Sequence, residues 1–236
     1  MRHARRAPLP AFATSDPLEP GILRAGAACG LCAALIYPLW SAVDLPLPLN
    51  RMLHFTFGPL LVVAFLGLDR WVQRQRPSVA ARIGCVFGAI AGVAFCAMTV
   101  VQAANLGWIS PRIEASADPL LQQDLRRVLD GVFSVQLGLD IVWDIHICLA
   151  TILLAASLPG EGLRLRAWRI YGVSAATATL GLNLLSFPIP PRDAGMVDGG
   201  PLVGAWYLGT TLIMIASLRA GGAQGTADLR QRAVGT

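Results

Sequence analysis

The residues with the greatest potential for chemistry lie in one apolar stretch, residues 132–158 (VFSVQLGLDIVWDIHICLATILLAASL). The stretch is long enough to cross a bilayer, yet it contains the polar residues Gln136, Asp140, Asp144 and His146. Hydrocarbon cannot solvate a charge, so ionisable residues are rare in membrane segments and each one marks a candidate functional site. Asp140 and Asp144 are therefore the candidate catalytic residues.

Helical spacing separates these polar residues into two groups. Residues four apart share a helix face, so Gln136, Asp140 and Asp144 form one stripe with Trp143 beside it, whereas His146 points roughly 80–120° away. Two carboxylates this close are not expected both to be ionised in a dry site. One protonated acid beside one carboxylate suits acid catalysis, proton coupling or cation binding. The alternative is a structural role, in which hydrogen bonds from the acids fix the helix register.

The composition indicates that this stretch is one of several membrane spans. The 236-residue chain is 55% apolar and 14% charged, with a mean hydropathy of +0.58, and several runs approach the ~20 residues that cross ~30 Å of hydrocarbon. The sequence predicts an all-α, polytopic membrane protein with a transmembrane domain at residues 22–219, between an N-terminal tail (1–21) and a flexible C-terminal tail (220–236). Six spans are expected, at about residues 25–43, 52–68, 83–106, 132–158, 170–187 and 201–218.

The arginines predict the orientation of these spans. All 19 basic residues are Arg, and cytoplasmic loops of membrane proteins carry an excess of basic residues. When the N-terminus is placed in the cytoplasm, 14 of the 19 arginines fall on that side. Both termini are therefore expected to be cytoplasmic. The outer side keeps five arginines: Arg51, Arg112, Arg126, Arg127 and Arg192.

The same topology brings further polar groups to the outer halves of the other spans. They are Asp44, His54, Gln102, Asn105 and Asn183, with Trp206 and Tyr207 near the same level. A cavity that opens to the outer side and is floored near Asp144 would keep these groups away from lipid. The candidate substrate-binding residues are Gln136, Trp143, His146, His54, Asn183, Trp206 and Tyr207.

Several function classes lack their motifs in this chain. Metal-ligand spacing such as HExxH is absent and His146 faces away from the two acids, so neither a metal nor another cofactor is expected. A phosphate-binding loop and a nucleophile elbow are also absent. The arginines lie between apolar runs rather than in a basic stripe with aromatics, which argues against nucleic acid as a partner. Cys29 and Cys32 form a CxxC motif within the first span, where a packing role is expected rather than a redox one.

Two local patterns predict how the helices begin and pack. Asp118 and Pro119 are a typical helix start, and the apolar periodicity that follows predicts an amphipathic helix that either lies on the membrane or continues into the fourth span. Gly84, Gly88 and Gly92 recur every four residues, which allows close approach of another helix. We expect this partner to lie within the chain, with a homodimer as the alternative.

The C-terminal half resembles an uncharacterised family of small bacterial six-helix integral membrane proteins. The resemblance rests on a D-x-x-W-D core in the fourth helix and on a loop of the form F-P-x-x-P…A-G-x-x-D-x-G-P…W-Y between the last two helices. It implies a bacterial inner-membrane location and six helices but no activity, and it adds Asp198 to the candidate binding residues. The matching positions are Asp140, Trp143, Asp144, Phe187, Pro188, Pro191, Ala194, Gly195, Asp198, Gly200, Pro201, Trp206 and Tyr207.

These observations leave different classes of function open. One is an intramembrane pocket that binds or acts on a lipid- or isoprenoid-like small molecule, for example in acid-initiated terpenoid cyclisation, where aromatic faces stabilise a developing cation. Another is a proton-coupled carrier or sensor of a small, cationic ligand; a carrier would be expected to show internal repeats. A third is an accessory subunit whose polar helix docks a partner. The expected partners are the lipid bilayer and a hydrophobic or amphipathic small molecule.

Overall fold

The computed structural model is all-helical over the residues it describes, which are 18–43 and 45–234, without the side chains of 40–42 and 221–234. Asp44 and residues 1–17 of the expected N-terminal tail lie outside the described residues. The helices in chain order are α1 (Glu19–Ala42), α2 (Leu47–Gln75), α3 (Val79–Trp108), α4 (Ser110–Ala115), α5 (Pro119–Ser157), α6 (Leu163–Ser186) and α7 (Gly200–Val234).

Each of the six expected spans falls on a helix that begins before it. Five helices, α1, α2, α3, α5 and α7, are long and apolar enough to cross a membrane. α6 has 24 residues, as many as α1, but it opens with Arg164, Arg166 and Arg169 and does not reach the same apolar content. α7 continues as a helix to Val234, although a flexible tail was expected from residue 220.

The outer surface of the helices is apolar in the way that a lipid environment requires. On α3, Val86, Val93 and Val100 recur every seven residues and are 55%, 63% and 54% exposed. Seven residues are close to two helical turns, so these side chains form one outward stripe. In water such a stripe would be an unusually large exposed apolar patch, whereas in a bilayer it contacts hydrocarbon. The chain therefore has the build of a multi-pass membrane protein.

The long helices form a closed ring. α1 packs against α2, α2 against α3, α3 against α5, α5 against α6 and α6 against α7, and α7 returns to pack against α1. Because consecutive helices are neighbours joined by short connections, the chain runs alternately up and down around the ring.

Glycines allow the closest crossings in this ring. A Cβ atom on Gly26 of α1 would lie 2.4 Å from the Cα atom of Gly67 on α2, so the two backbones are in direct contact. Gly88 and Gly92 of α3 face Phe65 and Val62 of α2, and Gly84 of the same helix faces α5. The expectation that the four-residue glycine ladder packs within the chain is confirmed.

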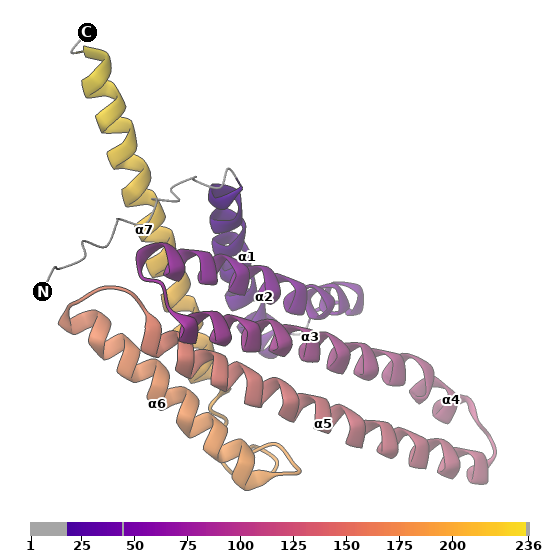
Figure 1. Ribbon diagram of the computed structural model, residues 1–236. Coiled ribbons are helices and arrows are strands. Elements are labelled where there is room, and N and C mark those ends of the chain that lie inside the picture. Colours follow the sequence, from indigo (N-terminus) through magenta and orange to yellow (C-terminus); the bar gives the residue numbers. More distant parts are fainter. Residues whose placement is uncertain (1–17, 44, 235–236) are drawn as a thin grey trace, which may run out of the picture.

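α5 is the longest helix, with 39 residues. The Asp118 carboxylate accepts a hydrogen bond from the amide of Leu120 at 2.9 Å, and Pro119 is the first helical residue, which confirms the predicted helix start. The helix runs without interruption into the span that carries Asp140 and Asp144. At about 1.5 Å per residue it is much longer than the hydrocarbon layer is thick. Figure 1 shows the hairpin of α3, α4 and the first part of α5 extending beyond the loop between α6 and α7.

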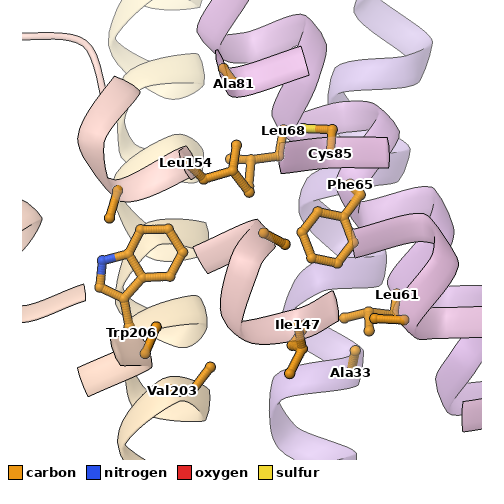
Figure 2. Close-up of a cluster of buried hydrophobic side chains, with 14 of the residues drawn as sticks. Ala33, Leu61, Phe65, Leu68, Ala81, Cys85, Ile147, Leu154, Val203 and Trp206 are labelled. Atoms are coloured by element: carbon orange, nitrogen blue, oxygen red, sulfur yellow. The ribbon is translucent and has the colours of Figure 1, made fainter. Parts of the chain in front are cut away.

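The buried side chains gather between α2, α3, α5 and α7. In Figure 2, Ile147 and Leu154 of α5 lie between Trp206 of α7 on one side and Phe65 of α2 on the other. The hydroxyl groups of Thr151 on α5 and Tyr207 on α7 form a hydrogen bond of 3.0 Å across the ring. These contacts hold α5 in place and thereby fix the direction of its polar stripe.

Candidate functional site

The ring encloses a cavity of about 750 Å³. Its lining comes from α1, α2, α3, α5 and α7, from Thr179 of α6, and from the loop between α6 and α7. This volume lies within the range of pockets that bind drug-sized ligands, roughly 300–1,000 Å³. The cavity is therefore large enough to enclose a small organic molecule.

Two of the three residues of the polar stripe on α5 line this cavity. Asp140 and Asp144 lie one turn apart and both line it, together with Trp143 and Ile147. Neither of the two ion pairs found among the described residues involves these acids. Their carboxylates are therefore available to a ligand that enters the cavity.

The loop between α6 and α7 adds a third acid from a distant part of the chain. Asp198 lines the cavity and lies close enough to Asp140 and Asp144 to interact with them electrostatically. Its carboxylate accepts a hydrogen bond from the Gly200 amide at 2.8 Å, which caps the first turn of α7. Arg192 and Asp193 of the same loop also line the cavity. The loop thus gives its end of the cavity several charged groups.

Four aromatic residues that contact one another line the cavity, and we call them the aromatic collar: Tyr37, Phe57, Phe95 and Trp143. They come from α1, α2, α3 and α5. Phe57 lies at the centre of the set, with ring-centroid distances of 4.6 Å to Phe95, 5.8 Å to Trp143 and 6.1 Å to Tyr37. Tyr37 also lies within electrostatic range of Asp140, Asp144 and Asp198. The collar and the acids therefore share one part of the cavity.

The part of the cavity away from this loop is apolar. On α1 the lining descends from Pro38 to Gly26, which is about 18 Å at about 1.5 Å of rise per residue. Below the collar the wall carries small and apolar side chains, with the Thr211 hydroxyl as a polar exception. They include Gly30, Ala33, Ala64, Phe65, Leu68 and Met214. The cavity therefore has one charged end and one apolar end.

Six of the predicted site residues meet at this cavity. They are Asp140, Asp144, Trp143, His54, Tyr207 and Asp198. His54 is on α2, and its Nδ1 atom lies 2.9 Å from the carbonyl oxygen of Asn50. Tyr207 lines the cavity, and its hydroxyl oxygen accepts the hydrogen bond from Thr151 of α5.

The other four predicted residues lie outside the cavity lining. His146 contacts Phe87 of α3, with 5.7 Å between ring centroids, and its Nδ1 atom meets the Val142 carbonyl. Asn183 is buried in α6, where its amide donates to the Thr179 carbonyl. Trp206 is fully buried and packs on Gly172 of α6. Gln136 lies further out on α5, where its Oε1 atom is buried with no hydrogen-bond partner among the described residues.

Sequence reasoning missed most of the collar and part of the loop. Phe57 and Phe95 give no signal in an apolar span, because a phenylalanine there is as well suited to lipid or to a helix interface as to a cavity. Arg192 was counted only as an outer-loop charge and Asp193 was not singled out, and only the fold of the loop brings them to the cavity. Among residues 18–43 and 45–234 no group of three or more His, Cys, Asp or Glu side chains is placed to hold a metal ion.

Comparison of the chain with protein-family models, with curated proteins and with solved structures finds no match. The function must therefore be inferred from the cavity and its residues.

Proposed function

We propose that the chain crosses the bacterial inner membrane six times, with both termini in the cytoplasm. The bias of the arginines supports this orientation. The closed ring supports the number of six spans. α6 packs between α5 and α7, and successive helices of the ring run in alternating directions, so α6 must cross the membrane as its neighbours do. The family resemblance of the C-terminal half favours the same number of helices. The loop between α6 and α7, and with it the charged end of the cavity, then faces the outer side.

Reporter fusions test this topology. Alkaline phosphatase is active only outside the cytoplasm, whereas green fluorescent protein folds well inside it. Fusions that end at Ser116, between α4 and α5, are expected to be active with phosphatase and dark with the fluorescent protein. Fusions that end at Pro77, between α2 and α3, are expected to give the reverse pattern. The same pattern at both positions would contradict the proposed topology.

We further propose that the central cavity binds a lipid- or isoprenoid-like small molecule. The observation that carries this proposal is the division of the cavity into a charged outer end and an apolar inner end. An amphipathic molecule satisfies both ends at once, because its polar group meets the acids while its apolar part removes about 25 cal/mol per Å² of surface from water. A purely polar ligand would leave the inner wall without a partner.

Asp140 and Asp144 supply the means for acid–base chemistry on such a molecule. If one of them is protonated, it can donate its proton to a carbon–carbon double bond of an isoprenoid, which leaves a carbocation. The rings of the aromatic collar stabilise that positive charge through their faces. After ring closure the proton returns to the second carboxylate, so the step balances without another reactant. Terpenoid cyclisation is therefore the concrete reaction that we propose to test.

Native mass spectrometry with lipid extraction tests the binding proposal. The comparison sets wild type beside Asp140→Asn, Asp144→Asn and the control Asp130→Asn, whose side chain is exposed on α5 outside the cavity. An amphiphile is expected to copurify with wild type and with the control, and to be lost from the two cavity variants at unchanged expression and melting temperature. Failure of both cavity variants to fold would instead show that the acids are structural.

A wild-type protein that carries no small molecule would contradict the proposal. It would favour a carrier, whose ligand passes through, or an accessory subunit that docks a partner. Proton flux in proteoliposomes would then separate these two, because only a proton-coupled carrier responds to its ligand with flux.

A further inference from the structure

The charged end of the cavity has an unusual wall for a group of carboxylates. Asp140 and Asp144 share the cavity lining with the rings of the aromatic collar, and Trp143 of the collar directly precedes Asp144 on α5. The collar rings of Phe57, Phe95 and Trp143 pack at 4.6–5.8 Å from one another. Aromatic faces carry a partial negative charge, so they attract cations and repel anions. The acids and the collar therefore both favour a cationic ligand.

The charge balance of the lining points in the same direction. Its acidic residues are Asp140, Asp144, Asp193 and Asp198, whereas Arg192 is its only arginine among the described residues. Arg192 belongs to the loop at the outer mouth, while Asp144 lies deeper, beside Trp143 of the collar. A ligand that reaches the level of the collar therefore meets negative charge and aromatic faces together.

We infer that the ligand carries an ammonium head, held between the aromatic collar and the carboxylates of Asp140 and Asp144, with a single apolar chain that extends toward Leu68 and Met214. The inference rests on the proposed binding of an amphiphile, not on the proposed cyclisation, and deepens it by naming the ligand class: with the head at this place, Asp140 and Asp144 hold the ligand and do not protonate a double bond. A bulky alkylated ammonium fits better than a metal ion, because its charge is spread over methyl groups that contact ring faces well. The same cation–π contact occurs in aromatic cages for quaternary ammonium groups.

The depth of the lining residues sets the orientation of this ligand. Gly30 of α1 and Ala64 of α2 lie at one level, since a Cβ atom on Gly30 would be 3.5 Å from that of Ala64. Tyr37 and Phe57 of the same two helices pair two turns further out. The apolar part of the cavity therefore lies on the inner side of the collar, and a chain attached to the head can extend only in that direction.

Three probes with the same chain separate charge from hydrophobicity: octyltrimethylammonium, octanol and octyl phosphate. Their affinities are measured by isothermal titration calorimetry on full-length protein in dodecyl maltoside. The proteins are wild type, Asp144→Asn and two matched variants, Phe57→Leu in the collar and Phe65→Leu below it. Phe57 and Phe65 both line the cavity and are 4% and 2% exposed, so the two substitutions remove equivalent rings from equally buried positions.

Wild type is expected to bind the ammonium probe at least about tenfold more tightly than octanol, and octyl phosphate most weakly. Phe57→Leu should weaken the ammonium probe about three- to tenfold while octanol changes by less than about twofold. Phe65→Leu should weaken both probes by the same factor, since its ring meets the chain and not the head. Asp144→Asn should remove most of the preference for the ammonium probe over octanol.

Equal binding of ammonium and octanol by wild type would overturn this inference and leave the amphiphile site intact. An equal loss of the preference for the ammonium probe over octanol in Phe57→Leu and Phe65→Leu would also overturn it, because the collar would then contribute no more to binding of the head than the ring below it. Tyr37→Leu provides a second collar variant if Phe57→Leu does not fold. If none of the probes binds to wild type, the proposed function itself is wrong.

Discussion

At the scale of single residues, position in the ring decides what a side chain does. Trp143 and Trp206 both come from apolar spans, and the sequence gives both the same candidate role. Trp143 belongs to the collar and lines the cavity, whereas Trp206 fills a notch above Gly172 between α6 and α7. A Cβ atom on Gly172 would lie 2.3 Å from the Trp206 ring, so the notch exists only because residue 172 has no side chain.

We therefore expect a tryptophan-to-leucine substitution to lower stability at position 206 and to lower ligand retention at position 143. Trp206→Leu removes a fully buried ring and should lower the free energy of unfolding by about 2–4 kcal/mol. Trp143→Leu should change stability much less and should weaken ligand retention instead. Thermal melting and the amount of copurified amphiphile, measured on both variants, check this pair. A larger loss of stability in Trp143→Leu would contradict the assignment of Trp143 to the cavity wall.

At the scale of helices, close crossings and hydrogen bonds determine how the ring is held together. In lipid no hydrophobic effect drives helices together, so packing of small residues and interhelical hydrogen bonds must do so. The chain uses both. Gly26 and Gly67 bring α1 and α2 into backbone contact, while the indole nitrogen of Trp71 on α2 donates to the hydroxyl of Ser217 on α7 at 2.7 Å.

The crossing of α1 and α2 can be tested with two glycines of the same helix. Gly26→Ala places a methyl group 2.4 Å from the Gly67 backbone, so the helices must move apart and the melting temperature should fall. Gly21→Ala is the matched control, because nothing lies within 4 Å of its Cβ position. Alanine is the better helix former, by about 1 kcal/mol in water, so the control should keep or raise the melting temperature. Equal effects would indicate that the crossing is not tight.

At the scale of the whole molecule, the closed ring creates the cavity and gives it a defined depth. Each helix contributes only a narrow strip to the wall, and the charged end is completed by the loop between α6 and α7. Apolar side chains on the opposite faces of the helices, such as Val93, remain exposed to lipid. The ring thus has two apolar surfaces, one on its outside and one that lines the cavity.

The depth of the cavity predicts selection by chain length. Ala64→Leu enlarges a side chain in the apolar wall of the cavity and should shift the copurified amphiphiles to shorter chains. The total amount of bound amphiphile should stay the same, because the residues that hold the head are unchanged. Ala97→Leu is the control, since Ala97 of α3 is exposed and does not line the cavity. Mass spectrometry of the extracted lipids gives the chain-length distribution. An unchanged distribution in Ala64→Leu would mean that the chain does not occupy the inner half.

The sequence by itself determined where the long helices lie, the start of α5 and the position of the acidic pair. Each of these depends on local physics. A span needs a run of apolar residues, Asp118 and Pro119 satisfy the free amides at a helix start, and a spacing of four places Asp140 and Asp144 on one face. For the same reason His146 could be assigned to another face, where the structure has it in contact with Phe87.

Only the tertiary structure decided which other side chains join the acidic pair. Asp198 reaches the pair because the loop after α6 folds back over the ring, and Phe57 and Phe95 reach it because α2 and α3 turn those faces inward. Periodicity tells which residues of a helix share a face, but not whether that face meets a neighbour, the bilayer or a cavity. In an apolar span all three environments suit the same residue types. Which environment a helix face meets therefore depends on the contacts between helices.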